Sequence, residues 1–171
     1  MFTSKICIVG DFGVGKTSTV ERFVNSQFSE KYLTTVGVKV DTKSVTSDGY
    51  EHKLVVWDVA GTNKFGELEF SYLRGAAGYI LVADGTRRNT VENAKSLLAQ
   101  IESRYGSVVP IVFLVNKSDV QPEWEVTAAD IEQLGENYGP LFLTSAKTGD
   151  HVDTAFSVLT SLIIKQNLDG G

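Results

Sequence analysis

A stretch near the start of the chain has the residue types and spacing that phosphate binding requires. Residues 10–17 read Gly-Asp-Phe-Gly-Val-Gly-Lys-Thr and match the pattern G-x-x-x-x-G-K-[ST]. The glycines allow backbone N–H groups to wrap around a phosphate chain, next to the N-terminus of a following helix. The Lys16 ammonium would reach the terminal phosphates, and the Thr17 hydroxyl would hold Mg²⁺. An ordinary glycine-rich turn is the alternative, but a strand pattern at 6–9 and a helix pattern at 19–25 flank the motif and favour nucleotide binding.

A second polar motif, Asn116-Lys117-Ser118-Asp119, follows the most apolar stretch of the chain. The Asp119 carboxylate can accept hydrogen bonds from both N1–H and the 2-amino group of guanine, and adenine offers neither proton there. Taken alone, the motif is also compatible with a polar turn after a strand. Because the motif lies about one hundred residues after a phosphate loop, it indicates guanine recognition. The backbone N–H groups of Ser145-Ala146-Lys147, after the last expected strand, would complete the base pocket.

A third set of residues is suited to Mg²⁺ and to a terminal phosphate. Asp58 and Gly61 form D-x-x-G after a strand, which places an acidic Mg²⁺ partner near a glycine N–H. Thr35, in a polar loop, would supply a second hydroxyl to the ion. The alternatives are an ordinary strand-end turn and a threonine that bonds its own backbone.

The apolar patterns predict the elements that carry these motifs. Strand-like runs alternate with helix-like stretches, which is typical of an α/β fold with a mostly parallel sheet and helices on both faces. The turn signal Ser47-Asp48-Gly49 predicts a hairpin, so one edge strand of a six-stranded sheet is expected to be antiparallel. Alternation of Val36, Val38 and Val40 predicts that this strand is half-buried. The expected strands are 6–9, 36–40, 54–57, 79–82, 111–115 and 141–143, and the expected helices lie at 19–25, near 68–73, at 94–105, around 131–134 and at 152–163. The motifs then meet outside the carboxyl ends of the strands.

Composition limits the class of protein. A length of 171 residues fits one domain, and the first residues are too few before the first strand for a signal peptide. A net charge of −5 argues against a nucleic-acid-binding surface, and no segment is apolar enough for a membrane span. The single cysteine, Cys7, is expected to be a buried hydrophobe in a reducing compartment, so we expect a cytoplasmic protein. His52 and His151 have no ligand-like neighbours and are expected on the surface.

With these motifs in this order, the chain resembles a Ras-superfamily small GTPase over essentially its whole length, and it is most similar to the Rab group. Rab-like segments are Thr34-Thr35-Val36-Gly37-Val38, Trp57-Asp58 and Ser71-Tyr72-Leu73-Arg74-Gly75-Ala76. The resemblance implies a single small-GTPase domain, 1–171, with the P-loop NTPase fold. It also implies a switch that binds GTP or GDP with Mg²⁺ and hydrolyses GTP.

The resemblance implies a role for each motif residue. Phosphates and base would be bound by Gly13, Val14, Gly15, Lys16, Thr17, Ser18, Phe28, Asn116, Lys117, Asp119, Ser145, Ala146 and Lys147. The metal ligands would be Thr17, Thr35 and, through water, Asp58; hydrolysis would involve Lys16, Thr35, Gly61 and Thr62. An effector, an exchange factor and a GTPase-activating protein would bind the loops around 28–38 and 59–74. We expect no nucleic-acid partner, and a monomer.

Several positions depart from the family pattern. Thr62 stands where the family has a water-orienting glutamine, so slow intrinsic hydrolysis is expected. Phe12 is bulkier than the usual residue of the phosphate loop and would obstruct an arginine finger. Of the effector-binding aromatic triad, Trp57 and Tyr72 match, while Val40 stands where phenylalanine is usual. The last residues of the sequence contain no cysteine, so no lipidation site is expected there.

Two other functions remain open on these residues. One is a hydrolysis-deficient GTP-binding module, or a G domain excised from a larger protein, which Thr62 favours. The other is an ATP-dependent P-loop kinase, which has the same phosphate cradle but conflicts with Asp119.

Overall fold

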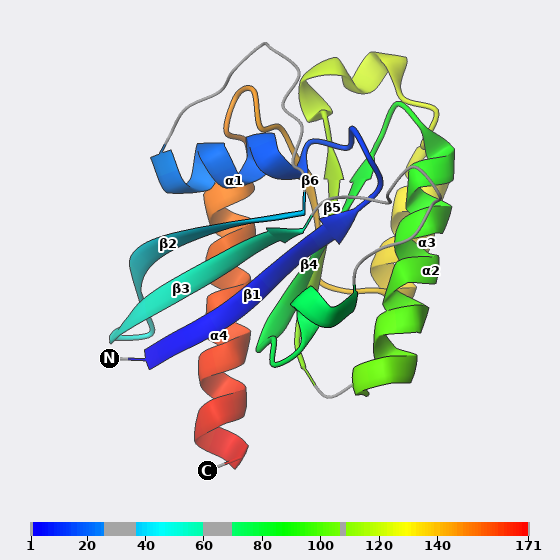
Figure 1. Ribbon diagram of the computed structural model, residues 1–171. Coiled ribbons are helices and arrows are strands. Elements are labelled where there is room, and N and C mark those ends of the chain that lie inside the picture. Colours follow the sequence, from blue (N-terminus) through cyan, green and yellow to red (C-terminus); the bar gives the residue numbers. More distant parts are fainter. Residues whose placement is uncertain (1, 26–36, 60–69, 107–108, 171) are drawn as a thin grey trace.

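The sheet at the centre of the molecule contains six strands in the order β2-β3-β1-β4-β5-β6 (Figure 1). The computed structural model describes residues 2–25, 37–59, 70–106 and 109–170. The strands are β1 (Phe2–Gly10), β2 (Val38–Ser47), β3 (Tyr50–Val59), β4 (Gly78–Asp84), β5 (Ile111–Asn116) and β6 (Leu141–Thr144). The helices are α1 (Lys16–Asn25), α2 (Arg88–Tyr105), α3 (Ala128–Asn137) and α4 (Val152–Gly170), with short 3-10 helices η1 (Phe70–Leu73) and η2 (Ser118–Glu123). The predicted α/β fold is therefore confirmed.

Strand directions follow the predicted pattern. β1 is parallel to β3 and β4, and β4, β5 and β6 are parallel to one another. The edge strand β2 is antiparallel to β3. Asp48 and Gly49 connect these two strands with φ of 53° and 80°, the positive values that a two-residue hairpin turn requires. The hairpin predicted from the turn signal is confirmed.

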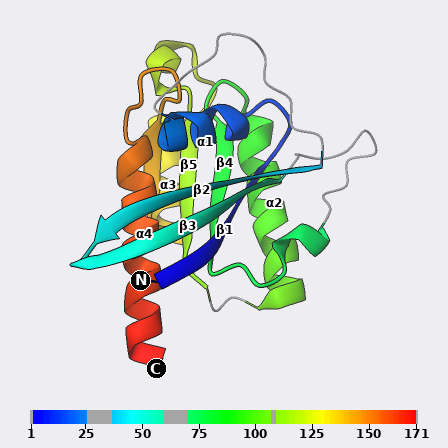
Figure 2. The ribbon, with the colours of Figure 1, turned by 60° about the vertical axis from the view of Figure 1, so that its left-hand side comes forward.

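Helices cover both faces of the sheet, with α1 and α4 on one side and α2 and α3 on the other (Figures 1 and 2). Side chains of β1 alternate between the two layers: Ile8 packs in the cluster that contains Phe156 of α4, and Cys7 packs in the cluster that contains Leu98 of α2. Because both faces are buried, the strand reads as a continuous apolar run. Burial raises the pKa of the Cys7 thiol to about 12, so this cysteine is the buried hydrophobe that the sequence predicts.

The edge strand β2 differs from the prediction. Val38 is half-buried against the cluster that includes Trp57 and Tyr72, but the Val40 side chain is 47% exposed. The opposite face of β2 packs on the helices instead, with Val45 against the α1–α4 cluster. Within the described residues α1 and α4 contact β2, whereas α2 contacts β4 and β1. Val36 lies outside the described residues.

His52 was expected on the surface and is instead fully buried on β3. Its Nε2 lies 2.8 Å from the Ser4 hydroxyl oxygen, and its ring stacks on Phe2. His52 shares a strand face with buried Leu54 and Val56, so a period-two pattern extended backwards would have placed it inside. His151 is exposed, as predicted.

Burial gives His52 a role in the pH dependence of stability. Loss of solvation lowers the pKa of its imidazole below the ordinary value, so the unfolded chain binds the proton more readily than the folded chain. Stability attributable to His52 is therefore present above about pH 6.5 and is lost as the pH falls below that value, with a slope of at most about 1.4 kcal/mol per pH unit.

Urea unfolding of the wild type, His52→Gln and His151→Gln between pH 7.5 and 5.5 measures this contribution. We expect a shallower fall in the free energy of unfolding for His52→Gln and a fall like that of the wild type for the exposed control. Equal pH slopes for all three proteins would contradict the assignment.

Candidate functional site

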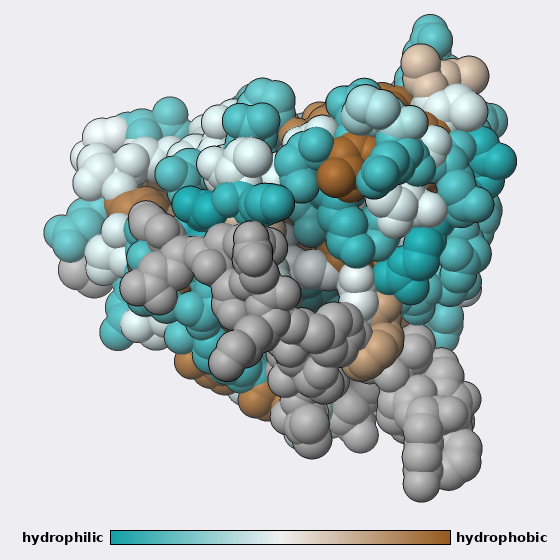
Figure 3. All heavy atoms as spheres, turned by 90° about the horizontal axis from the view of Figure 1, so that it is seen from above, coloured by the Kyte–Doolittle hydropathy of each residue, from teal (hydrophilic) through white to brown (hydrophobic). Residues whose placement is uncertain are grey.

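The predicted motifs meet at the edge of the sheet formed by the carboxyl ends of the parallel strands, at the top of Figure 1. The carboxyl ends of β1, β3, β5 and β6 all lie at this edge. Seen from above, the described part of this surface is mostly hydrophilic with separate hydrophobic patches (Figure 3). This placement follows from the parallel arrangement, as open α/β sheets require.

The phosphate-loop motif connects β1 to α1, in the strand–loop–helix order that the sequence predicts. Gly13 and Gly15 have φ of 76° and 99°, values that side chains disfavour. A Cβ at Gly15 would lie 2.3 Å from the Asn116 amide nitrogen, and a Cβ at Gly10 would lie 2.3 Å from the Val82 carbonyl oxygen. The loop thus depends on glycine both for its backbone path and for close packing on neighbouring segments.

The Lys16 side chain is only 6% exposed, and its Nζ donates to the Asp11 carbonyl at 2.9 Å. Burial lowers the pKa of Lys16 to about 8, while the nearby carboxylates of Asp58 and Asp11 act in the opposite direction. Placing an ammonium group in such a confined position is costly unless anions compensate it. A phosphate chain in the glycine loop fits this requirement.

Two side chains whose oxygen atoms can bind a metal ion lie together beside Lys16. The Thr17 hydroxyl, at the start of α1, donates to Oδ2 of Asp58 at 2.7 Å. Asp58 is fully buried at the end of β3. Hydroxyl and carboxylate oxygens are the hard ligands that Mg²⁺ prefers, so the pair fits the predicted ion. The four predicted residues Phe28, Thr35, Gly61 and Thr62 lie outside the described residues.

The buried Asn116 side chain joins the phosphate loop to the base motifs. Its Nδ2 donates to the Val14 carbonyl at 3.0 Å. Its Oδ1 accepts from the Thr144 hydroxyl at 3.2 Å and from the Ala146 N–H at 3.3 Å. One amide at the end of β5 therefore uses both its donor and its acceptor to hold the phosphate loop and the end of β6 with the loop that follows it.

The two motifs assigned to base recognition are also in contact. The Ser145 hydroxyl donates to Oδ1 of Asp119 at 2.8 Å, which brings the loop after β6 onto the start of η2. Lys117 adopts a left-handed backbone with φ of 77°. Its Nζ lies 3.5 Å from the Gly13 carbonyl, so the stem of Lys117 extends from the base motif to the phosphate loop.

Sequence reasoning missed Asp84, a fully buried carboxylate at the end of β4. Its Oδ2 lies 2.6 Å from Lys117 Nζ, and its Oδ1 accepts from the backbone N–H and the hydroxyl of Thr86. Burial opposes ionisation, but these hydrogen bonds outweigh it and hold the pKa of Asp84 below its usual value. The signal was present, since Asp84 ends an apolar strand just as Asp58 and Asn116 do.

Two further residues that position the base loops gave no recognisable sequence signal. Arg22 of α1 donates from Nε to the Ala146 carbonyl at 2.9 Å and from Nη2 to the Lys147 carbonyl. The Trp124 indole N–H donates to the Lys117 carbonyl at 2.8 Å. The Trp124 ring fills the space beside Gly85, where a Cβ would lie 2.1 Å from the ring.

Comparison with known proteins decides the family. A sequence model described as the Ras family matches residues 5–165. The chain belongs to the Ras family. Ras-family GTPases bind GTP and GDP with Mg²⁺, so membership confirms the predicted fold class, the guanine-nucleotide switch and its cofactors. GTPase activity is likewise established at the level of the family.

Individual relatives place the chain among Rab-like proteins. It is 38% identical to the Ypt/Rab-type GTPase YPT7 of Saccharomyces cerevisiae, over 95% of this chain and 82% of that protein. It is 32% identical to the GTP-binding protein ypt2 of Schizosaccharomyces pombe, over 96% and 83% of the two chains. It is 35% identical to the Ras-related protein Rab-13 of Bos taurus, over 94% and 79%. The Rab-like resemblance is confirmed, and Rab-like GTPases interact with effectors, exchange factors and activating proteins.

Among the helices of the described ranges, none combines the length and the apolar character that crossing a membrane requires.

The contacts of Asn116 lead to a stability prediction. Asn116→Ala removes the partners of the buried Val14 carbonyl and Ala146 N–H, so we expect a loss of about 2 to 3 kcal/mol in the free energy of unfolding. Asn137→Ala is the matched control, because this exposed amide bonds only the Gln133 carbonyl of its own helix among the contacts described. We expect its effect to stay below about 0.5 kcal/mol. Urea titration at pH 7 compares the two variants, and similar small effects would show that Asn116 does not hold the segments together.

Proposed function

We propose that this Ras-family switch binds its nucleotide through the residues that the described structure gathers at one sheet edge. The observation that carries the proposal is the double link between base motif and phosphate loop, made by Asn116 to Val14 and by Lys117 to Gly13. Such links fix the separation between a base site and a phosphate site. A nucleoside polyphosphate has that same division into a base end and a phosphate end.

The phosphate end combines the glycine loop with the buried lysine. Gly13, Val14, Gly15 and Ser18 supply backbone N–H groups, and the Lys16 ammonium carries the charge that faces the β- and γ-phosphates. Thr17, Thr35 and Asp58 are the proposed Mg²⁺ ligands, with Asp58 acting through water. When bound, the ion neutralises phosphate charge. The contact between Thr17 and Asp58 supports this grouping, because it aligns two oxygen donors beside Lys16.

The base end provides guanine specificity. Asp119 accepts from guanine, and the backbone of Ser145, Ala146 and Lys147 surrounds the opposite side of the base. Phe28 and the stem of Lys117 would flank the ring. The Ser145–Asp119 hydrogen bond supports this arrangement, because it orients the carboxylate without taking up its second oxygen.

We further propose one small-GTPase domain over 1–171, monomeric and cytoplasmic. Its effector, exchange factor and activating protein would bind the loops around 28–38 and 59–74. Side chains beside those loops support this surface: Val40 is exposed, and the Trp57 and Tyr72 rings lie 6.4 Å apart between centroids. Valine in place of phenylalanine at position 40 offers less apolar area, which narrows the range of partners that bind it well.

Base specificity is tested by nucleotide competition. Wild-type protein should retain labelled GDP against ATP and release it against GTP, because adenine leaves the Asp119 carboxylate unpaired. Asp119→Asn should shift the preference toward xanthine nucleotides, whose 2-oxo group accepts from the new amide. Asp153→Asn, at an exposed position of α4, is the matched control and should keep guanine preference. ATP that competes within about tenfold of GTP would overturn the base-pocket assignment.

We also propose that intrinsic hydrolysis is slow because Thr62 is too short to orient the attacking water. Thr62→Gln should raise single-turnover hydrolysis on the order of tenfold to a hundredfold while leaving GDP affinity nearly unchanged. Thr62→Ala, which adds no carboxamide, should stay close to the wild-type rate.

Phe12 is the competing cause of slow hydrolysis. If its bulk occupies the place of the water, Thr62→Gln acts only together with Phe12→Gly, and the gains in a double-mutant cycle are non-additive. A wild-type rate equal to that of the double variant would mean that another residue orients the water.

A further inference from the structure

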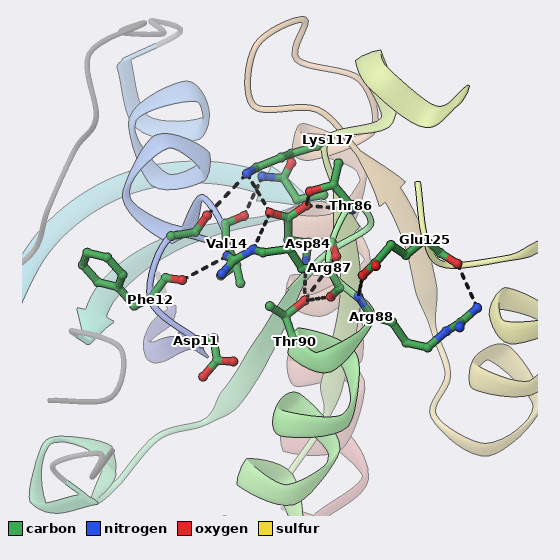
Figure 4. Close-up of polar contacts among 12 residues, drawn as sticks. Asp11, Phe12, Val14, Asp84, Thr86, Arg87, Arg88, Thr90, Lys117 and Glu125 are labelled. Carbon is green, nitrogen blue, oxygen red and sulfur yellow. Dashed lines mark hydrogen bonds and ion pairs between the residues drawn. The ribbon is translucent and has the colours of Figure 1, made fainter. Parts of the chain in front are cut away.

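Arg87, immediately before α2, connects the phosphate loop to the buried carboxylate of Asp84 (Figure 4). Its Nε lies 3.1 Å from Oδ2 of Asp84, and its Nη2 donates to the Phe12 carbonyl at 3.0 Å. The two contacts use different arms of one planar guanidinium. The rigid fork therefore sets the distance between the end of β4 and the middle of the phosphate loop.

Asp84 is a fixed anchor for this fork. It is fully buried and also accepts from Lys117 and Thr86, so its position is set on several sides. Thr90 adds a further restraint, because its hydroxyl accepts from the Asp84 backbone N–H at 2.8 Å. Through Asp84, the arginine that contacts the phosphate loop is tied to the lysine of the base motif.

A side chain of α2 itself reaches the same part of the loop. Asn93 donates from Nδ2 to the carboxylate of Asp11, the residue before Phe12. Asn93 and Arg87 thus hold two consecutive residues of the phosphate loop, Asp11 through its side chain and Phe12 through its carbonyl. Both contacts lie on variable positions of the G-x-x-x-x-G-K-[ST] motif, which the motif itself leaves unassigned.

We propose that Arg87 is a positioning residue that slows nucleotide release by fixing the peptide between Phe12 and Gly13. In a trans peptide the C=O and the next N–H point in opposite directions. A Phe12 carbonyl held by Arg87 therefore turns the Gly13 N–H away from α2. The inference rests on the proposed function, because it requires the side opposite Arg87 to be the one that the phosphates occupy.

An arginine at such a position ordinarily forms an exposed ion pair, which contributes little to the stability of the protein. Arg87 differs in two respects: its carboxylate partner is completely buried, and its other partner is a backbone carbonyl inside the binding loop. The neighbouring Arg88 provides the comparison. It points away from the loop and toward Glu125, whose carbonyl accepts from Arg88 Nη2 at 2.8 Å (Figure 4). Arg88 also forms an ion pair with Asp130 at 2.9 Å.

The experiment measures dissociation of fluorescently labelled GDP from the purified full chain, chased with excess GDP. Arg87→Ala should release GDP about tenfold faster than the wild type, the scale of one charge-assisted hydrogen bond. Arg88→Ala should stay within about twofold of the wild type, because its contacts do not reach the loop. The GDP release rate of Arg87→Lys should lie between those of Arg87→Ala and Arg88→Ala, since one ammonium cannot bind both acceptors as the guanidinium fork does.

Thermal unfolding of the same variants separates positioning from a general loss of stability. Each alanine variant loses one ion pair and one hydrogen bond to a backbone carbonyl, and Asp84 keeps Lys117 and Thr86 as partners in Arg87→Ala. Similar drops in Tm are therefore expected, and only Arg87→Ala should also change the dissociation rate. Should Arg87→Ala fail to fold, Arg87→Lys alone decides, with faster release at an unchanged Tm as the supporting result. Wild-type release rates in the Arg87 variants would overturn the inference and leave the proposed function intact. A wild-type protein that binds no GDP would overturn both.

Discussion

Hydrogen bonding of a single buried amide, that of Asn116, is the interaction on which the rest of the site depends. It joins the phosphate loop, the end of β6 and the loop that follows β6. A buried amide without partners would be costly, so each of these segments is held in the position that satisfies it. The position of this amide also excludes a side chain at residue 15, because a Cβ at Gly15 would lie 2.3 Å from the amide nitrogen. The glycine of the motif is thus required by the asparagine of the base segment.

The parallel sheet brings these groups together, and the helices then secure them. Every strand of the β3-β1-β4-β5-β6 portion ends at the same edge, which is why Asp84 lies directly beside Asn116 and why Asp58 reaches the same edge despite their separation in sequence. Helix α1 contributes in two directions: Thr17 binds Asp58 on one side, and Arg22 binds the carbonyls of the loop after β6 on the other. Helix α2 adds the contact of Asn93 to the loop, and Arg87, just before this helix, adds another. Phosphate and base segments are therefore connected through the body of the protein.

Cationic side chains gather around the phosphate loop although the net charge of the chain is negative. The chain carries a formal net charge of −5, yet Lys16, Arg87 and Lys117 converge on the phosphate-loop edge. Two of these cations are balanced by Asp84, whereas Lys16 lies buried beside the glycine loop with Asp58 and Asp11 nearby. An acidic protein can thus bind an anionic ligand, because a few cations in a confined site outweigh distant surface charge. Net charge alone argues against a nucleic-acid-binding surface, and it gives no sign of this local cluster of cations.

Local pattern determined much of the fold from the sequence alone. The apolar run of β5, the Asp48-Gly49 turn and the strand–loop–helix setting of the phosphate motif each depend on neighbouring residues, so their spacing suffices to predict them. The remaining features depend on contacts between distant segments. Arg87 meets Phe12 across 75 positions, and Arg22 meets Ala146 across 124, and no spacing rule connects such pairs. Exposure of Val40 was decided in the same way, because alternation along a strand defines two faces but only the packed helices decide which face they cover.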